Sequence, residues 1–437
     1  MKSQPAKGSA LDIPVIPAGE PLAGWQCLLG ALRAPRTAIR LLCKLGLEAG
    51  KPDPAISRQR VQNSRLEPYS GPMLVVAAAA ALLVAAGAEE AVRAERSPGA
   101  VYTMSNATRG NRILAFDRAP NGTLTPAGSF ATGGLGTGGG LGNQGGLTSS
   151  DNDRWLLAVN AGSNDVSLFA TDDDGLRWVD KVPSGGLQPV SVTIHRDLVY
   201  VLNAGSDNVS GFRLRPHGKL SPLVGSTRPL SGSGTGPAQV QFSADGRVLV
   251  VTEKATNLIV TYAVDEDGFL GPPQPQASQG VTPFGFAFGP RRQLFVSEAF
   301  GGAPGGSAVS SYHVNVDGRL QIVSPSVATH QTAACWVVVT EDGRFAYTTN
   351  TGSGSISGYE IDDDGALTLL NADGRTADTG AGSAPTDLAL SENGRFLFVL
   401  NSAAHSISAF RILGSGQLQP VTAAGGLPAG VNGLAAR

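Results

Sequence analysis

Short apolar segments separated by turns recur along most of the chain, and one of them returns seven times. Each copy is rich in β-branched and aromatic residues and ends on a polar residue, a composition that favours a β-strand. The copies occupy residues 101–106, 156–160, 199–203, 249–253, 294–298, 346–350 and 397–401. They are spaced by about 49 residues, which is typical of the blades of a β-propeller.

A second segment follows each copy and carries an aromatic residue at its fourth position. These aromatics are Phe116, Phe169, Phe212, Tyr262, Tyr312, Tyr359 and Phe410. A glycine lies six residues beyond each of them, at Gly122, Gly175, Gly218, Gly268, Gly318, Gly365 and Gly416. Glycine provides the positive φ that tight hairpins need. The constant interval therefore predicts a hairpin and a further strand in every repeat.

A third kind of segment precedes the first and is joined to it by short Asp-Gly or Asn-Gly turns. It is seen at residues 189–194, 238–243, 284–289, 335–340 and 386–391. One repeat thus contains four antiparallel strands, here called a, b, c and d in chain order. We predict an all-β fold, a seven-bladed β-propeller over residues 100–437. Residues 431–436 match strand a, so the C-terminal strand is expected to close the first blade.

The segment before the repeats has a different character. Residues 1–72 show no repeat and are expected to be disordered or a non-native upstream segment, with the start at Met1 or Met73 left open. Residues 73–88 hold an apolar run that is short for a membrane span and typical of a signal peptide. A short membrane anchor is the alternative. Residues 89–99 are predicted to be a linker, and the protein is expected to be exported to the periplasm or the cell exterior.

Composition narrows the classes of function. Residues 73–437 carry 23 Lys and Arg against 30 Asp and Glu, which argues against a nucleic-acid surface. The chain has three cysteines and no CxxC pair, so we expect neither a zinc site nor a disulfide framework. We predict a monomer without metal or cofactor that acts on a small molecule. A membrane contact is expected only through an uncleaved N-terminal segment.

In a four-stranded blade, the a–b and c–d turns lie on one face and the b–c and d–a loops on the other. The second face carries the longer loops, residues 133–146 and 301–306, and we expect the site there, at the mouth of the central channel. Glu253 and Glu298 interrupt a series of asparagines at the ends of strands b, and His330 opens a strand a. These three are the predicted catalytic residues.

Further side chains on the same face are predicted to bind substrate. They are Arg109, Asn160, Asn203, Lys254, Asn350, Asn401 and His405. For the asparagines, the alternative is a structural role, in which the amide caps a loop through hydrogen bonds. No group of residues has the spacing of a metal site, a phosphate-binding loop or a serine nucleophile elbow.

The repeats resemble the β-propeller lactonase family, which includes 6-phosphogluconolactonase-type and carboxymuconate-cyclase-type proteins. The resemblance rests on residues 245–253, 342–350 and 393–401 and on the Asp-Gly hairpins, and residues 200–203 are also similar to the YVTN propellers. It implies hydrolysis or formation of a lactone ring of a small organic or sugar acid, without a metal. Family members often carry a Pro-Arg-His step, and the matching residues here are Pro237, Ala238 and Gln239.

Two functions therefore stay open at this point. In the first, the protein is a lactonase-type hydrolase or cycloisomerase in which Glu253, Glu298 or His330 activates water, while Arg109 or Lys254 holds a carboxylate. In the second, it is a non-catalytic exported propeller that binds a ligand or a protein partner at the mouth. The replaced Arg-His step favours the second, whereas the family resemblance favours the first, which is the function we predict.

Overall fold

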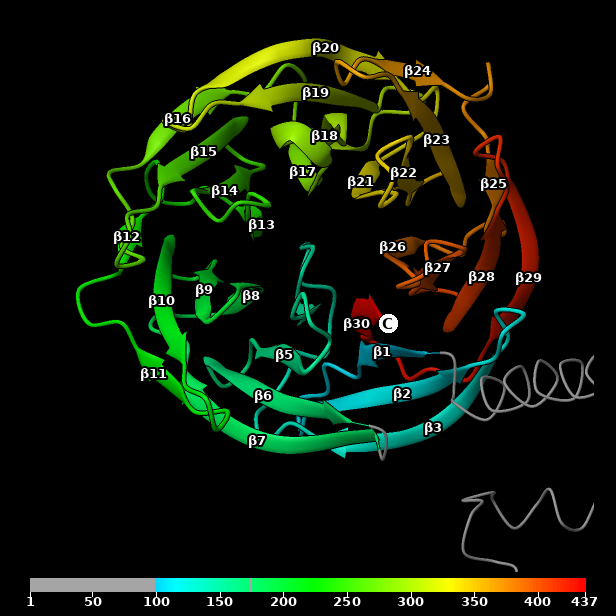
Figure 1. Cartoon of the computed structure of the whole chain (residues 1–437). Helices are drawn as coiled ribbons and strands as arrows, with labels where there is room; N and C mark the ends of the chain where they lie inside the picture. Colours follow the sequence, from blue (N-terminus) through cyan, green and yellow to red (C-terminus); the bar gives the residue numbers. More distant parts are fainter. Residues whose placement is uncertain (1–98, 173–174) are drawn as a thin grey trace, which may run out of the picture. The chain divides into compact units, whose positions relative to one another are not determined.

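A computed structural model describes residues 99–172 and 175–437. The expectations for residues 1–72, 73–88 and 89–98 lie outside this part of the chain. Seven antiparallel sheets stand around a central axis like the blades of a propeller (Figure 1). The predicted fold class is confirmed. In the part that the structure describes, no helix has the length and apolar character needed to cross a membrane.

The blades repeat one strand order from the axis outward. The inner strands a are β30 (Asn432–Ala436), β4 (Leu147–Ser149), β8 (Pro189–His195), β13 (Pro237–Phe242), β17 (Pro283–Phe288), β21 (Ala334–Val339) and β26 (Pro385–Leu390). The strands b are β1 (Ala100–Met104), β5 (Trp155–Asn160), β9 (Leu198–Asn203), β14 (Val248–Glu253), β18 (Gln293–Glu298), β22 (Phe345–Asn350) and β27 (Phe396–Asn401).

The two outer positions follow the same rule. The strands c are β2 (Arg112–Arg118), β6 (Asp165–Asp172), β10 (Asn208–Leu214), β15 (Leu258–Ala263), β19 (Ala308–Val314), β23 (Ser355–Ile361) and β28 (Ser406–Ile412). The strands d are β3 (Leu124–Ala131), β7 (Gly175–Pro183), β11 (Leu220–Pro222) with β12 (Arg228–Pro229), β16 (Gln274–Ala277), β20 (Leu320–Ala328), β24 (Leu367–Leu369) with β25 (Ala377–Asp378), and β29 (Leu418–Ala424). Two single-turn 3₁₀ helices, η1 (Pro290–Arg292) and η2 (Phe300–Gly302), lie beside β18.

The C-terminal strand closes the ring as predicted. β30 pairs with β1, so that Val101 lies opposite Ala436 and Thr103 opposite Leu434. The Thr103 hydroxyl also donates a hydrogen bond to the carbonyl oxygen of Gly433 at 2.7 Å. The first blade therefore takes its inner strand from the far end of the chain, and no blade is left with an unpaired seam.

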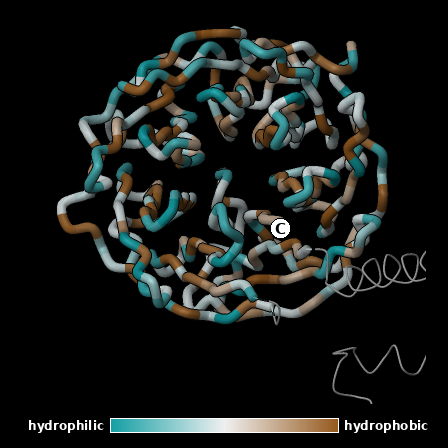
Figure 2. The backbone as a smooth tube through the Cα atoms, viewed as in Figure 1, coloured by the Kyte–Doolittle hydropathy of each residue, from teal (hydrophilic) through white to brown (hydrophobic). Residues whose placement is uncertain are grey.

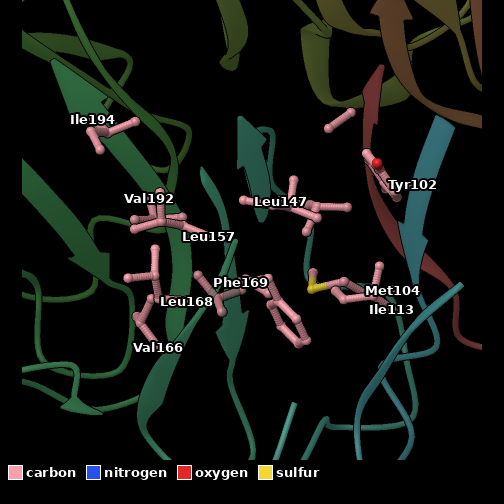
Figure 3. Packing of buried hydrophobic residues seen from close by; sticks show 14 of the residues in the cluster. Tyr102, Met104, Ile113, Leu147, Leu157, Val166, Leu168, Phe169, Val192 and Ile194 are labelled. Carbon is pink, nitrogen blue, oxygen red and sulfur yellow. The ribbon is translucent and has the colours of Figure 1, made fainter. Parts of the chain in front are cut away.

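The core lies between neighbouring blades. Figure 3 shows one such layer, in which Tyr102 and Met104 of the first blade approach Leu147 and Phe169 of the second. Phe169, one of the aromatics at the repeated interval, is fully buried. Hydrophobic and hydrophilic positions interleave around the whole ring (Figure 2). Each blade buries its two faces against its two neighbours, so the chain has several small core layers instead of one oversized core.

At six of the seven copies of the repeated interval the glycine packs closely against a neighbouring blade, whereas a Cβ atom at Gly175 would meet nothing within 4 Å. At Gly122, φ is +91°, and a Cβ atom there would lie 2.5 Å from the ring of Phe396. Phe396 is itself fully buried on β27. At Gly122 the interval therefore meets two requirements at once, a left-handed turn and a close contact between blades.

Gly122→Ala is expected to lower the free energy of unfolding by about 2–4 kcal/mol, because it adds backbone strain to an overpacked contact. Urea denaturation measures the change. Gly414→Ala is the matched control, since a Cβ atom at Gly414 would meet no other atom within 4 Å and its φ is not in the left-handed region. Equal losses in the two variants would contradict this account of the interval.

Candidate functional site

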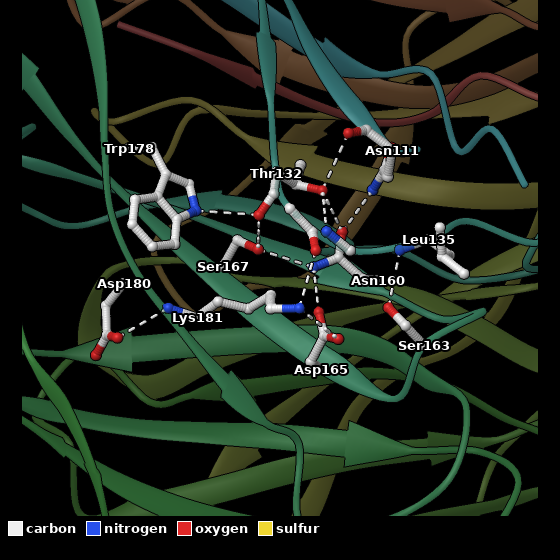
Figure 4. A network of polar contacts seen from close by, with 12 residues as sticks. Asn111, Thr132, Leu135, Asn160, Ser163, Asp165, Ser167, Trp178, Asp180 and Lys181 are labelled. Carbon is white, nitrogen blue, oxygen red and sulfur yellow. Dashed lines mark hydrogen bonds and ion pairs between the residues drawn. The ribbon is translucent and has the colours of Figure 1, made fainter. Parts of the chain in front are cut away.

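The polar side chains at the ends of strands b fasten loops. The Asn160 amide nitrogen donates to Asp165 Oδ1 at 2.6 Å and to Ser167 Oγ at 2.8 Å. Its oxygen accepts from Thr132 Oγ1 at 2.7 Å and from Asn111 Nδ2 at 3.0 Å. Figure 4 shows this network, which joins the first two blades. The Asn160 amide thus has all its hydrogen bonds satisfied within the protein.

The other predicted asparagines have the same role in part. Asn350 donates to Ser355 and Ser357, Asn401 to Ser406 and Ser408, and Asn203 to Asn208. Each of these contacts joins the end of strand b to the start of strand c. The structural alternative for the asparagines, loop capping, therefore describes what these amides do. A contact with substrate stays a prediction.

Glu253 and Glu298 are fully buried and surrounded by donors. Glu253 accepts from the Ser231 backbone at 2.9 Å and from Thr256 Oγ1 at 2.7 Å. Glu298 accepts from the Gly280 backbone at 2.7 Å and from Ser326 Oγ at 2.6 Å. Each carboxylate joins the d–a loop to its own blade, and neither lines the cavity described below.

The remaining predicted residues are not brought together. Arg109, His330 and His405 lie in exposed loop positions of three different blades. Lys254 is partly buried, and its ammonium group donates to the carbonyl oxygens of Gly142 and Pro237 and lies 4.9 Å from the centre of the Phe284 ring. Burial lowers the pKa of Lys254 to about 8. This lysine thus holds a loop in place.

That loop is the glycine-rich segment 133–146, and it closes the channel at the end where we expected the mouth. Figure 1 shows the segment between β3 and β5 reaching toward the axis. The Gln144 backbone donates to Ala238 at 3.0 Å, and its side chain donates to the Val337 carbonyl oxygen at 2.8 Å. The Trp336 indole donates to Asn143 at 2.7 Å. We call residues 142–145 the plug.

Two further features seat the plug. The Asn143 side chain donates to Val190 on β8 and accepts from Asn432 on β30. Gly285 on β17 has no side chain where a Cβ would come within 2.0 Å of Gln144 Oε1. The plug therefore contacts five of the inner strands, β8, β13, β17, β21 and β30, toward the side of the b–c loops. Its glycines let a backbone pass through a space that side chains would block.

A cavity of about 840 Å³ extends from the plug to the opposite face. Its wall comes from the second halves of the inner strands, and its rim includes the exposed residues Asp151, Ala244 and Glu341 in or near the a–b turns. The cavity therefore opens on the face of the short turns, not on the face of the long loops. None of the ten site residues predicted from the sequence lines it.

Asp387 stands out among the groups that line this cavity. It lies on β26, is 3% exposed, and accepts hydrogen bonds from the backbone of Leu388 at 2.8 Å and of Leu434 at 3.0 Å. Burial raises the pKa of Asp387 well above its ordinary value, against the opposing effect of these two donors. A carboxyl group with a perturbed pKa in the wall of a cavity is a candidate for a reactive group.

Sequence reasoning missed Asp387 because it lies inside a largely apolar segment of the sequence, residues 386–391. One signal was available: it is the only acidic residue within the strand a segments of the sequence. At the rim, His195 Nδ1 lies 3.9 Å from Asp151 Oδ2. Within the described ranges, no three His, Cys, Asp or Glu side chains gather as a metal site would require.

Comparison with known proteins agrees with this architecture. A family model described as lactonase, seven-bladed β-propeller, matches residues 110–233 and 307–432, more than half of the chain. None of the curated proteins compared with the chain matches it significantly in sequence.

Solved structures share the fold at low identity. A candidate 6-phosphogluconolactonase from Bacteroides uniformis is 19% identical with a TM-score of 0.61, covering 76% of this chain and 98% of its own. The periplasmic gluconolactonase PpgL of Pseudomonas aeruginosa is 18% identical with a TM-score of 0.58 and the same coverages. Identities this low show the fold alone. Together, the seven repeats, the closed ring of sheets and the matching family model establish that this chain belongs to the lactonase family of seven-bladed β-propellers.

Proposed function

We propose that the protein hydrolyses a small lactone inside the channel cavity, with Asp387 as the base that activates water. The observation that carries this proposal is the buried carboxyl group of Asp387, with its raised pKa, in the wall of a cavity closed at one end by the plug. The lactonase names of the B. uniformis and P. aeruginosa proteins support the same reaction class.

The reaction needs one proton acceptor and returns the proton. The Asp387 carboxylate takes a proton from water as the water oxygen attacks the lactone carbonyl carbon. When the ring C–O bond breaks, the leaving alkoxide oxygen takes that proton back, and a hydroxy acid is the product. A base whose pKa is raised above its ordinary value is suited to both transfers.

Polar side chains in the cavity wall could orient the lactone. Gln241 and Thr193 line the cavity on inner strands of other blades. Among the residues that the structure describes, the Gln241 amide nitrogen donates to no acceptor. It is therefore available to hold the lactone carbonyl oxygen, where charge develops during the attack. The closed end keeps the substrate against the wall instead of letting it pass through the channel.

The proposal is tested with purified protein and a panel of sugar, alkyl and aryl lactones, followed by release of acid at constant pH. We expect hydrolysis above the buffer rate for at least one lactone. No rate above buffer for any lactone would overturn the assignment. Glu298→Gln and His330→Ala belong in the same assay: if they remove the rate while Asp387→Asn does not, the catalytic centre lies at the b–c loops, as the sequence predicts.

A further inference from the structure

The wall and rim of the cavity carry acidic groups without basic ones to balance them. Three carboxyl groups line it, those of Asp151, Glu341 and Asp387, together with the imidazole of His195. Among the described residues that form this lining, none is a lysine or an arginine. The imidazole is itself near a carboxylate, since His195 pairs with Asp151 at the rim.

Three of the cations on the same face have partners outside the cavity lining. Arg292 forms an ion pair with Asp245, Arg344 donates to the Gly414 carbonyl oxygen, and Arg437 donates to that of Asp172. Arg196 and Arg247 lie in a–b turns but do not belong to the lining. The Lys254 ammonium group lies at the other end of the channel and is committed to Gly142 and Pro237.

The rest of the lining suits an uncharged molecule. Apolar side chains such as Phe286 and Val338 alternate with neutral hydrogen-bonding groups, among them Thr193 and Gln241. Amides and hydroxyls of this kind pair with the hydroxyl groups and the carbonyl of a lactone. A phosphate or carboxylate would need cations or several backbone donors aimed at it, and would face the carboxylates instead.

We infer that the cavity accepts uncharged lactones and discriminates against lactones that carry a phosphate or carboxylate group. The inference rests on the proposed function and makes it narrower, since it separates this chain from a phosphogluconolactonase of the same family. The exposed rim carboxylates of Asp151 and Glu341 oppose an added anionic group, and we expect the two together to cost about tenfold in kcat/KM or affinity.

The test compares two pairs of molecules. Glucono-δ-lactone and its 6-phosphate are compared by kcat/KM, and the corresponding non-hydrolysable lactams, with and without the phosphate, by calorimetric affinity. We expect the uncharged member of each pair to be preferred by about tenfold or more. High ionic strength should narrow the gap, because the carboxylates at the rim are exposed to screening.

Glu341→Lys places a cation at the rim, and it should raise the affinity for the phosphorylated lactam by about tenfold while changing that for the uncharged lactam little. Glu360→Lys, with the same change of charge at an exposed position of β23 away from the cavity, is the matched control.

The binding arm decides the inference even if no lactone is hydrolysed. If the uncharged lactam binds and the phosphorylated one does not, the selectivity stands although the hydrolase assignment fails. Equal or tighter binding of the phosphorylated lactam, or no binding of either, overturns it. An effect of Glu360→Lys equal to that of Glu341→Lys also contradicts it, because overall charge rather than the rim would then be responsible.

Discussion

Asp387→Asn is expected to lower kcat for lactone hydrolysis by about 10²–10⁴-fold, the usual contribution of a positioned general base. Asparagine keeps the shape of the side chain but cannot accept the proton of water. One of the two backbone donors, Leu388 or Leu434, would then face an amide NH₂ group, which costs about 1–3 kcal/mol of stability. The variant is therefore checked for a cooperative unfolding transition before its rate is measured.

The control for this variant is Asp362→Asn, the same change in an exposed c–d hairpin far from the cavity. It should leave the rate within about a factor of two of the parent. Should Asp387→Asn keep the full rate while folded, Asp387 is not the base.

The pH dependence of kcat/KM is a second test of Asp387 as the base, and it uses the unaltered protein. Because the base must be ionised, kcat/KM of the unaltered protein should rise with pH through the raised pKa of Asp387 and then level off. The free energy of unfolding should instead fall as pH rises. A carboxyl group with a raised pKa in the folded state contributes stability below its ordinary pKa, and this contribution is lost as pH rises through the native pKa.

The slope expected from this one group is about 1.4 kcal/mol per pH unit between the two pKa values. Asp387→Asn should remove it, so that the difference in urea midpoint between the two proteins changes with pH. A difference that stays constant with pH would show that folding does not raise the pKa of Asp387.

Removal of residues 431–437 is expected to have the largest effect on folding. It deletes β30, opens the edge of β1 and exposes the channel wall, at the cost of buried Val431, Leu434 and Ala435. The loss of several buried side chains and a strand pairing is comparable with the net stability of a domain, about 5–15 kcal/mol. We expect no soluble monomer with a cooperative thermal transition.

A single substitution in β30 measures the contribution of one buried side chain while the strand pairing is kept. Leu434→Ala should lower the free energy of unfolding by about 2–4 kcal/mol, since Leu434 is 5% exposed. Leu413→Ala is the matched control, because Leu413 is 39% exposed, and it should cost less than about 1 kcal/mol. A stable truncated protein would mean that β30 is dispensable for the ring.

Local patterns were enough to predict the blades. The aromatic-to-glycine interval is visible in the sequence because each requirement, a left-handed turn at Gly122 and a buried ring at Phe116, acts on a single residue type. The closing strand was predictable because residues 431–436 repeat strand a. The first feature depends only on residues close in sequence, and the second only on the number of repeats, so both can be found without a structure.

The site could not be predicted in the same way. The glycine-rich segment 133–146 is recognisable as a long loop, but nothing local shows that Gln144 crosses the channel to Val337, 193 residues later. That contact turns the expected mouth into a closed end. Asp387 likewise has a raised pKa only because strands of other repeats surround it. Which residues meet at a given level of the channel is decided only when the blades are assembled, so it cannot be predicted from a single repeat.

One consequence of the closing strand concerns the order of events during synthesis. The backbone donor that Leu434 offers to Asp387 belongs to β30, which is synthesised after all the other strands of the seven blades. Earlier blades can form while the polypeptide is still growing, but the carboxyl group acquires its surroundings only after β30 has been synthesised and has paired with β1. Lactone hydrolysis would therefore report completed ring assembly, and nascent or prematurely terminated products would be inert however many blades they contain.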